Sequence, residues 1–143
     1  MTAKEYLRQI RHYDIRITRL LQERSELERA QTFLRRPQID GDRVQTSPSG
    51  DPPWMGYLIK WEALTLEIGR EWDELIEKKR TIMEQICALE DSRYIDILVK
   101  RYIEYKRFGR IAREMDYSTD RIIHLHGEAL QAFQHILASL GVV

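Results

Sequence analysis

A cluster of basic residues lies between positions 100 and 113 of the chain and contains a single acidic residue, Glu104. The basic residues are Lys100, Arg101, Lys106, Arg107, Arg110 and Arg113. Ammonium and guanidinium groups contact the phosphates of nucleic acids and so fix a protein's position on a duplex. A run of charge is more often only a solvated surface. This run adjoins a predicted pair of helices, which favours phosphate contacts from Lys106, Arg107, Arg110 and Arg113.

A second set of polar residues follows at the start of a predicted helix and faces away from its apolar side. The set consists of Thr119, Asp120, Arg121 and His124. Side chains of these types can hydrogen-bond to base edges in the major groove, where arginine on guanine is the commonest specific contact. For His124 an idle surface position is an equally good interpretation.

Two helices and a tight turn are needed to place these residues. Apolar side chains at helical spacing are Phe108, Ile111, Ala112 and Met115, which predict a helix over 108–115. Asp116 tolerates the left-handed backbone that the turn requires, and Ser118 is a good N-cap for the next helix. That helix has an inward stripe of Ile122, Leu125, Ala129, Phe133, Ile136 and Leu140. The arrangement is a helix-turn-helix, whose second helix enters the major groove.

The segment from Arg101 to Leu130 resembles region four of bacterial sigma factors, which reads the upstream promoter element. The matching residues are Arg101, Tyr102, Glu104, Phe108, Ile111, Ala112, Met115, Ser118, Ile122, Ala129 and Leu130. The family has glycine where Asp116 stands and a capping Ser or Thr where Arg107 stands. The resemblance covers about the last third of the chain and implies promoter-type DNA binding.

Nearly the whole chain also resembles small sigma-like proteins of phages and prophages of Gram-positive bacteria, described as late-transcription regulators. This resemblance rests on the opening MTAKEYL, the joint Leu89-Glu90-Asp91 and the run from Tyr117 to Leu130. It implies a transcription regulator whose partners are double-stranded DNA and RNA polymerase.

The first ninety residues predict two long helices. A heptad-like apolar seam runs from Tyr6 to Leu34, and a second from Leu58 to Leu89 that includes Trp72. Residues 1–36 carry nine Lys or Arg against five Asp or Glu, whereas residues 54–91 carry five against nine. These opposite charges favour an antiparallel hairpin, with the proline-containing segment 37–53 as its linker. A homodimer through the long helices is an alternative.

The predicted fold is therefore all-α. A coiled-coil-like helical hairpin occupies residues 1–90, and a three-helix helix-turn-helix domain occupies residues 91–143. Its first helix is capped by Asp91 and extends from Ser92 to about Lys106.

The chain lacks the patterns that enzymes and metal sites need. It contains no glycine-rich phosphate loop and no nucleophile elbow. His124 and His126 are two residues apart on a helix and point to different faces, which suits no metal. His126 lies on the apolar side and is predicted to be a hydrogen-bonded core residue. The single cysteine, Cys87, falls in a helical stripe and is predicted to be packed. We expect neither enzyme activity, nor a metal, nor a cofactor.

Composition gives no sign of a membrane protein. Apolar residues make up 43% and charged residues 32% of the chain, and the net charge is zero. No apolar run approaches the roughly 18 residues of a membrane span, and the opening residues lack a signal-peptide core. We expect a cytoplasmic protein.

Two functional hypotheses follow. The first is a DNA-binding transcription regulator that uses the helix-turn-helix. The second is a helical protein-interaction module in which the helix-turn-helix is only architectural. The zero net charge and the scarcity of basic residues on the second helix, where Arg121 is the only one before Glu128, favour the second hypothesis.

Overall fold

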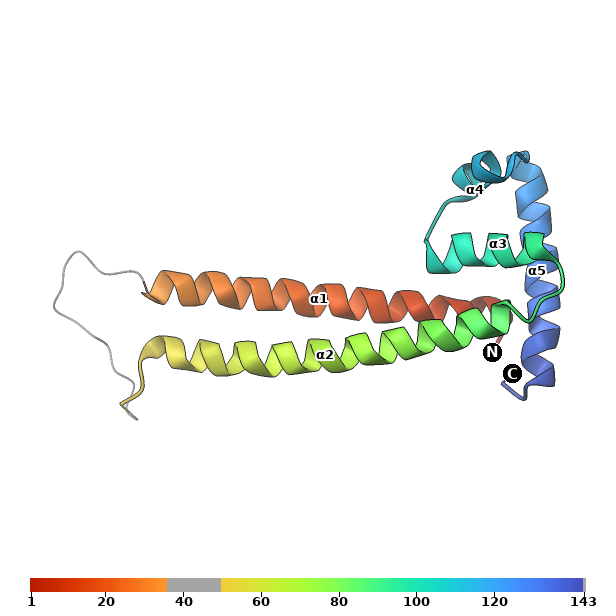
Figure 1. The fold of residues 1–143 in the computed structure, drawn as a ribbon. Helices are drawn as coiled ribbons and strands as arrows, with labels where there is room; N and C mark the ends of the chain where they lie inside the picture. The colour runs from red at the N-terminus through yellow and green to blue at the C-terminus, as the bar shows by residue number, and fades with distance from the viewer. Residues whose placement is uncertain (36–49, 143) are drawn as a thin grey trace. The chain divides into compact units, whose positions relative to one another are not determined.

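A computed structural model describes residues 1–35 and 50–142, without the side chains of 33–35. Every regular element in these residues is a helix, as predicted (Figure 1). The elements are α1 (Ala3–Arg35), α2 (Pro53–Ile86), α3 (Ser92–Leu98), the π-helix η1 (Val99–Ile103), α4 (Phe108–Met115) and α5 (Thr119–Ser139). The predicted linker, 37–53, lies mostly outside the described residues. Pro53 opens α2, where its missing N–H costs nothing.

The helices α1 and α2 run antiparallel, as their contacts show. Glu28 accepts a hydrogen bond from Trp61 Nε1 at 2.8 Å, and Arg24 donates one to Thr65 at 3.3 Å. Arg16 forms an ion pair with Glu71 at 3.1 Å, a contact that unites the basic first helix with the acidic second. Residues further along α1 contact residues earlier in α2, so the two helices are antiparallel and form a hairpin.

The buried stripe of α2 is narrower than predicted. Ile68, Leu75 and Ile82, seven residues apart, are buried, as is Ile86, but Trp72 is 42% exposed. We predicted Trp72 as a seam residue, and that was wrong. A helix with one long neighbour can bury only a narrow stripe, so the large ring at the stripe's edge stays partly in solvent.

The helix α2 ends at Ile86, four residues before the predicted end. The chain then turns through Cys87 and Ala88, and Leu89 N–H bonds to Ile86 O at 3.0 Å. Cys87 is an exposed free thiol, so its predicted packed role was wrong. The turn lets Leu89 stay buried while Asp91 caps α3 through Arg93 N–H at 2.9 Å.

The chain divides into two compact units, and the boundary differs from the predicted one at residue 90. One unit comprises Met1–Tyr13 with Glu74–Val143, and the other comprises Asp14–Asp73. The first turns of α1 therefore belong with the C-terminal helices. Ala3 N–H donates to Gln134 Oε1 at 2.6 Å, and the rings of Tyr6 and Phe133 lie 6.3 Å apart.

The helix predicted over 92–106 has a different end. It is α-helical only to Leu98 and continues as η1, in which Glu104 N–H reaches Val99 O at 3.0 Å. Tyr105 then adopts a left-handed conformation with φ 57°, and Lys106 N–H closes the turn on Lys100 O at 2.9 Å. Glycine or proline would ordinarily mark such an ending, and this segment contains neither.

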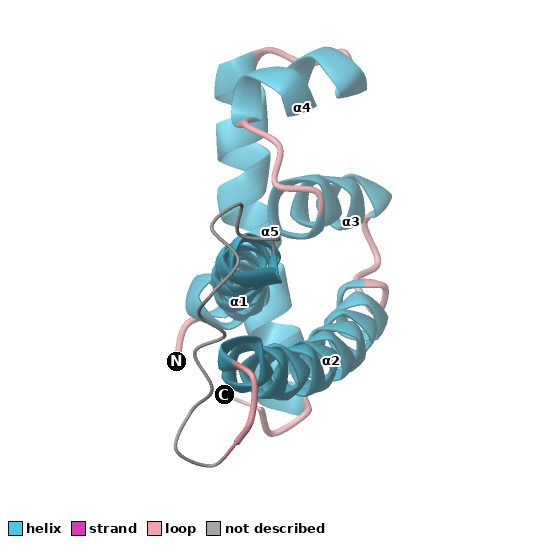
Figure 2. Ribbon diagram, turned by 90° about the vertical axis from the view of Figure 1, so that its left-hand side faces the viewer, coloured by secondary structure: helices cyan, strands magenta, loops and turns pink. Residues whose placement is uncertain are grey.

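The core of the helix-turn-helix is small and apolar. Ile97 of α3, Ile111 and Ala112 of α4, and Ile122 and Leu125 of α5 form one buried cluster. Figure 2 shows the backbone of α3, α4 and α5, the three helices that contribute these residues. Within the described residues, no helix has the length and apolar character needed to cross a membrane.

Candidate nucleic-acid interface

The first helix of the motif, α4, has the predicted bounds and the predicted inner face. Ile111 and Ala112 are buried, whereas Phe108 and Met115 are half-buried against the same core. The short side chain of Ala112 occupies the middle of this face. Its apolar residues fall on one stripe, so α4 presents its other side, with Gly109, Arg110 and Arg113, to solvent.

The turn after α4 depends on Asp116. Its backbone is left-handed, with φ 58° and ψ 39°, as predicted for this position. Tyr117 N–H bonds to Ala112 O at 2.9 Å, a six-to-one contact typical of a Schellman ending. Ser118 then caps α5 by accepting a hydrogen bond from Arg121 N–H at 3.1 Å. The short connection points the start of α5 away from the core.

The faces of α5 separate much as predicted. The buried residues are Ile122, Leu125, His126, Ala129, Phe133 and Leu137. Leu140, predicted to be inward, is 56% exposed, because the helix ends at Ser139 and Leu137 already completes the stripe. Thr119, Asp120, Arg121 and His124 are all exposed, so the four predicted base-facing residues share the outer surface of the first two turns.

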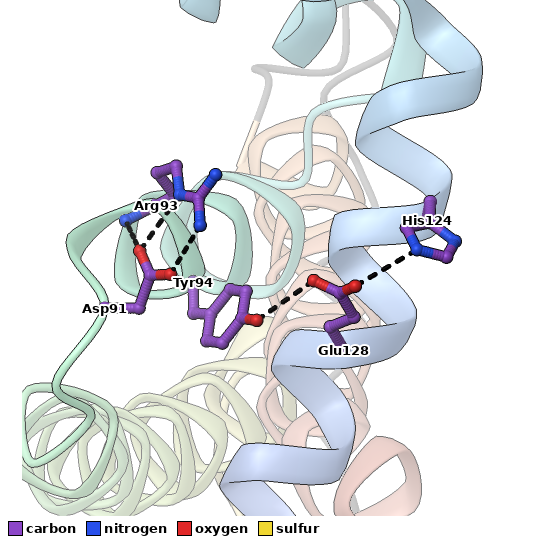
Figure 3. A network of polar contacts seen from close by, with 5 residues as sticks. All are labelled: Asp91, Arg93, Tyr94, His124 and Glu128. Atoms are coloured by element: carbon purple, nitrogen blue, oxygen red, sulfur yellow. Dashed lines mark hydrogen bonds and ion pairs between the residues drawn. The ribbon is translucent and has the colours of Figure 1, made fainter.

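His124 belongs to a polar network that reaches across to α3 (Figure 3). Its Nε2 lies 3.0 Å from Glu128 Oε1, one helical turn along. Glu128 Oε2 accepts a hydrogen bond from the Tyr94 hydroxyl at 3.0 Å, and this contact raises the pKa of Tyr94. The imidazole is therefore already engaged, and contact with a base would need the ring to turn away from Glu128.

Glu114 neutralises part of the basic run. Its carboxylate lies 2.9 Å from Lys100, 3.0 Å from Lys106 and 3.4 Å from Arg110. Hydrogen bonds from Lys100 and Lys106 lower the pKa of Glu114 to about 2, so it is ionised at any physiological pH. Lys106 also pairs with Glu104 at 3.2 Å. The charges of residues 100–113 did not predict these ion pairs, because Glu114 lies one residue beyond that run.

The four predicted phosphate-contacting residues lie together. Lys106, Arg107, Arg110 and Arg113 line one shallow hollow of about 450 Å³ with Tyr105 and Gly109. Their charges are not equally available, since Lys106 and Arg110 have carboxylate partners. In the part of the chain that the structure describes, Arg107, Arg113 and Arg121 form no ion pair. These three guanidiniums are free to meet an anion.

His126 is the buried, hydrogen-bonded histidine that its position predicted. It is 8% exposed, and its Nε2 lies 2.9 Å from the hydroxyl of Tyr102, with the ring edge-on to Phe108 at 4.9 Å. Burial lowers the pKa of His126 to about 4, assisted by the charges of Arg101 and Lys4. The ring is neutral at physiological pH and links η1 to α5.

The first turns of α1 carry basic residues that the sequence argument left out. Lys4, Arg8 and Arg11 line a second cavity together with Arg101 and Arg107. Their spacing of four and three residues places them on one helical face, a signal present in the sequence. No family model, curated protein or solved structure matches this chain.

Proposed function

We propose that the chain is a DNA-binding transcription regulator of phage or prophage type, which reads DNA with the outer face of α5. The proposal rests on the position of α5 beside the basic hollow. The exposed first two turns of α5 follow directly on α4, whose outer face helps to line the basic hollow. A groove-reading helix beside phosphate-contacting cations is the geometry of this class of DNA-binding domain.

The roles divide by charge and position. Arg107 and Arg113 make phosphate contacts directly, and Lys106 and Arg110 do so while shared with Glu114. Arg121 is the strongest candidate for base reading, because its guanidinium is exposed and forms no ion pair with the described residues. Thr119, Asp120 and His124 complete the surface. The long helical hairpin serves for dimerisation or for contact with RNA polymerase.

Salt dependence tests the proposal. The full chain is first used to select bound duplexes from a random pool, and the affinity for the selected duplex is then measured across salt concentrations. Removing one phosphate contact lowers the slope of log affinity against log salt by about one, so Arg113→Ala should do so. Glu114→Gln releases Lys100, Lys106 and Arg110 and should steepen the slope.

The matched control is Arg70→Ala, which removes an exposed arginine from α2. Its slope should equal that of the unmodified chain. If no duplex is selected, or if Arg113→Ala and Arg70→Ala behave alike, the proposal fails.

A protein-interaction module is the second candidate, and a specific observation favours it. Four large apolar residues of α2 are exposed: Ile59 at 62%, Leu66 at 67%, Trp72 at 42% and Ile76 at 59%. Two of them, Ile59 and Leu66, are seven residues apart and lie on one face of the helix. Exposed apolar side chains seven residues apart on one helical face are typical of a helix that packs against another helix. A second copy of the chain is the simplest occupant, which gives a homodimer through the long helices.

A further inference from the structure

The second cavity lies within the compact unit that contains both ends of the chain, and it has a volume of about 720 Å³. It is lined by Lys4, Arg8, Arg11, Arg101 and Arg107, together with apolar and aromatic side chains and His126. The lining therefore contains five cationic side chains and no aspartate or glutamate. So many like charges around one hollow produce a strongly positive potential.

The three cations of α1 are arranged unfavourably for the isolated chain. Lys4 and Arg8 are four residues apart, and Arg8 and Arg11 three apart, so they are neighbours on the helix surface. Like charges at this spacing destabilise a helix. Within the described residues none of the three forms an ion pair. An anion in the cavity would turn this repulsion into attraction.

Aromatic rings hold two of the guanidiniums in place. Arg101 lies 4.1 Å from the centroid of Phe108 and donates to Lys106 O at 3.2 Å. Arg11 lies 5.6 Å from the centroid of Tyr105. One face of each ring is thus occupied by a cation, so these rings orient charge rather than offer a stacking platform for a nucleobase.

The backbone around the cavity is also unusual. Arg101 and Tyr102 belong to η1, and π-helical turns occur frequently at functional sites. Tyr105 has a left-handed conformation, which is costly for a large side chain and persists only where its surroundings enforce it. These two irregularities turn the chain so that Arg107 joins Arg101 at the same hollow.

We propose that this cavity binds a small polyanion that carries two or more phosphate groups. Five cations around one hollow exceed what a single phosphate can contact, and phosphate oxygens are the preferred partners of clustered guanidiniums. DNA is a stiff rod whose phosphates lie on a convex surface, so it meets protruding cations more readily than those that line a cavity. None of the four predicted base-facing residues of α5 lines this cavity, although Arg107 lines both it and the basic hollow.

His126 gives the site a reporter. Its ring lines the cavity and is kept neutral partly by the charges of Arg101 and Lys4. A bound polyanion offsets those charges and adds negative charge near the ring. The pKa of His126 should therefore rise on binding, a response that a purely structural cluster of arginines would not produce.

Pyrophosphate is the probe for the test, added to the full chain at physiological ionic strength. Calorimetry should show saturable binding with one ligand per chain, and NMR should show a higher pKa for His126. Arg8→Ala and Arg11→Ala each remove one charged contact from an exposed position and should weaken binding by about tenfold. Arg19→Ala, an exposed α1 position that does not line the cavity, is the matched control and should bind as tightly as the unmodified chain.

A competing duplex distinguishes the source of the phosphate. Because Arg107 lines both hollows, saturating DNA should weaken pyrophosphate binding by no more than the loss of one cation, about tenfold, if the site takes a free small molecule. If the duplex displaces pyrophosphate and Arg8→Ala weakens duplex binding, the cavity serves the DNA backbone and the proposal is overturned. Absence of saturable binding, or equal binding by Arg8→Ala and Arg19→Ala, overturns it as well.

Discussion

His126 connects the stability of the fold to pH. In the folded chain the pKa of His126 is about 4, against 6.5 for an unperturbed histidine. The unfolded chain therefore takes up the proton first as the pH falls. Stability contributed by the neutral ring is complete above pH 6.5 and is lost as the pH falls towards 4.

We therefore predict that the free energy of unfolding falls by about 2 kcal/mol between pH 7 and pH 5 because of this residue. Urea unfolding at the two pH values measures the change. His126→Gln, which retains a hydrogen-bonding group beside Tyr102, should be less stable at pH 7 but should lose most of this dependence. The carboxylates of Asp91 and Glu114 have lowered pKa values and titrate below the window. An equal pH dependence in the variant would contradict the assignment.

At the same scale, single residues show why charge in a sequence is hard to interpret. The basic run suggested four equivalent phosphate contacts, yet Glu114 engages two of them and Glu104 engages Lys106 again. Side-chain pairing across one helical turn and a loop decides which cations are free. That pairing depends on the left-handed turn at Tyr105, and no residue type in the segment predicts such a turn.

Among the elements, α4 and α5 were the most predictable. Three local features of the sequence predict the same turn: a short apolar stripe, a residue that tolerates positive φ and a capping serine. The end of α3 has no such feature. Whether a helix widens into η1 or continues depends on packing, and the sequence of 99–106 suits both outcomes.

Gly127 gives a prediction at the scale of the element. It lies in the exposed face of α5, and a methyl group added there would meet nothing within 4 Å. Alanine is favoured over glycine in a helix by about 1 kcal/mol, so Gly127→Ala should raise the melting temperature by roughly 3 °C. Thermal unfolding followed by circular dichroism measures the shift.

Gly141 is the matched contrast. Its φ is +72°, a conformation in which alanine is strained, so Gly141→Ala should lower the melting temperature. Equal shifts in the two variants would contradict the assigned backbone conformations.

Gly127→Ala also probes the proposed interface. A more stable chain with weaker DNA binding would place the outer face of α5 in contact with the duplex.

For the whole molecule, charge separates the two candidate functions. Residues 54–91 have an excess of acidic groups, so two copies of α2 repel each other. Association through Ile59 and Leu66 should therefore strengthen as salt screens that repulsion. DNA binding has the opposite dependence, because salt competes with the protein for phosphates.

We predict that sedimentation velocity shows concentration-dependent association, and that Leu66→Glu abolishes it without changing the free energy of unfolding by more than about 0.5 kcal/mol. Glu67→Gln, at the neighbouring exposed position, should retain association and strengthen it slightly, because it removes one of the repelling charges. A single species with the mass of one chain at every concentration and salt would exclude the homodimer.

The unit that holds the helix-turn-helix is assembled from the two extremes of the sequence. Ala3 bonds to Gln134, and Tyr6 packs near Phe133, so these contacts span almost the entire chain. During synthesis on a ribosome, the first turns of α1 can form these contacts only after α5 has left the ribosome. The unit that contains the helix-turn-helix is therefore expected to assemble only after α5 has been synthesised.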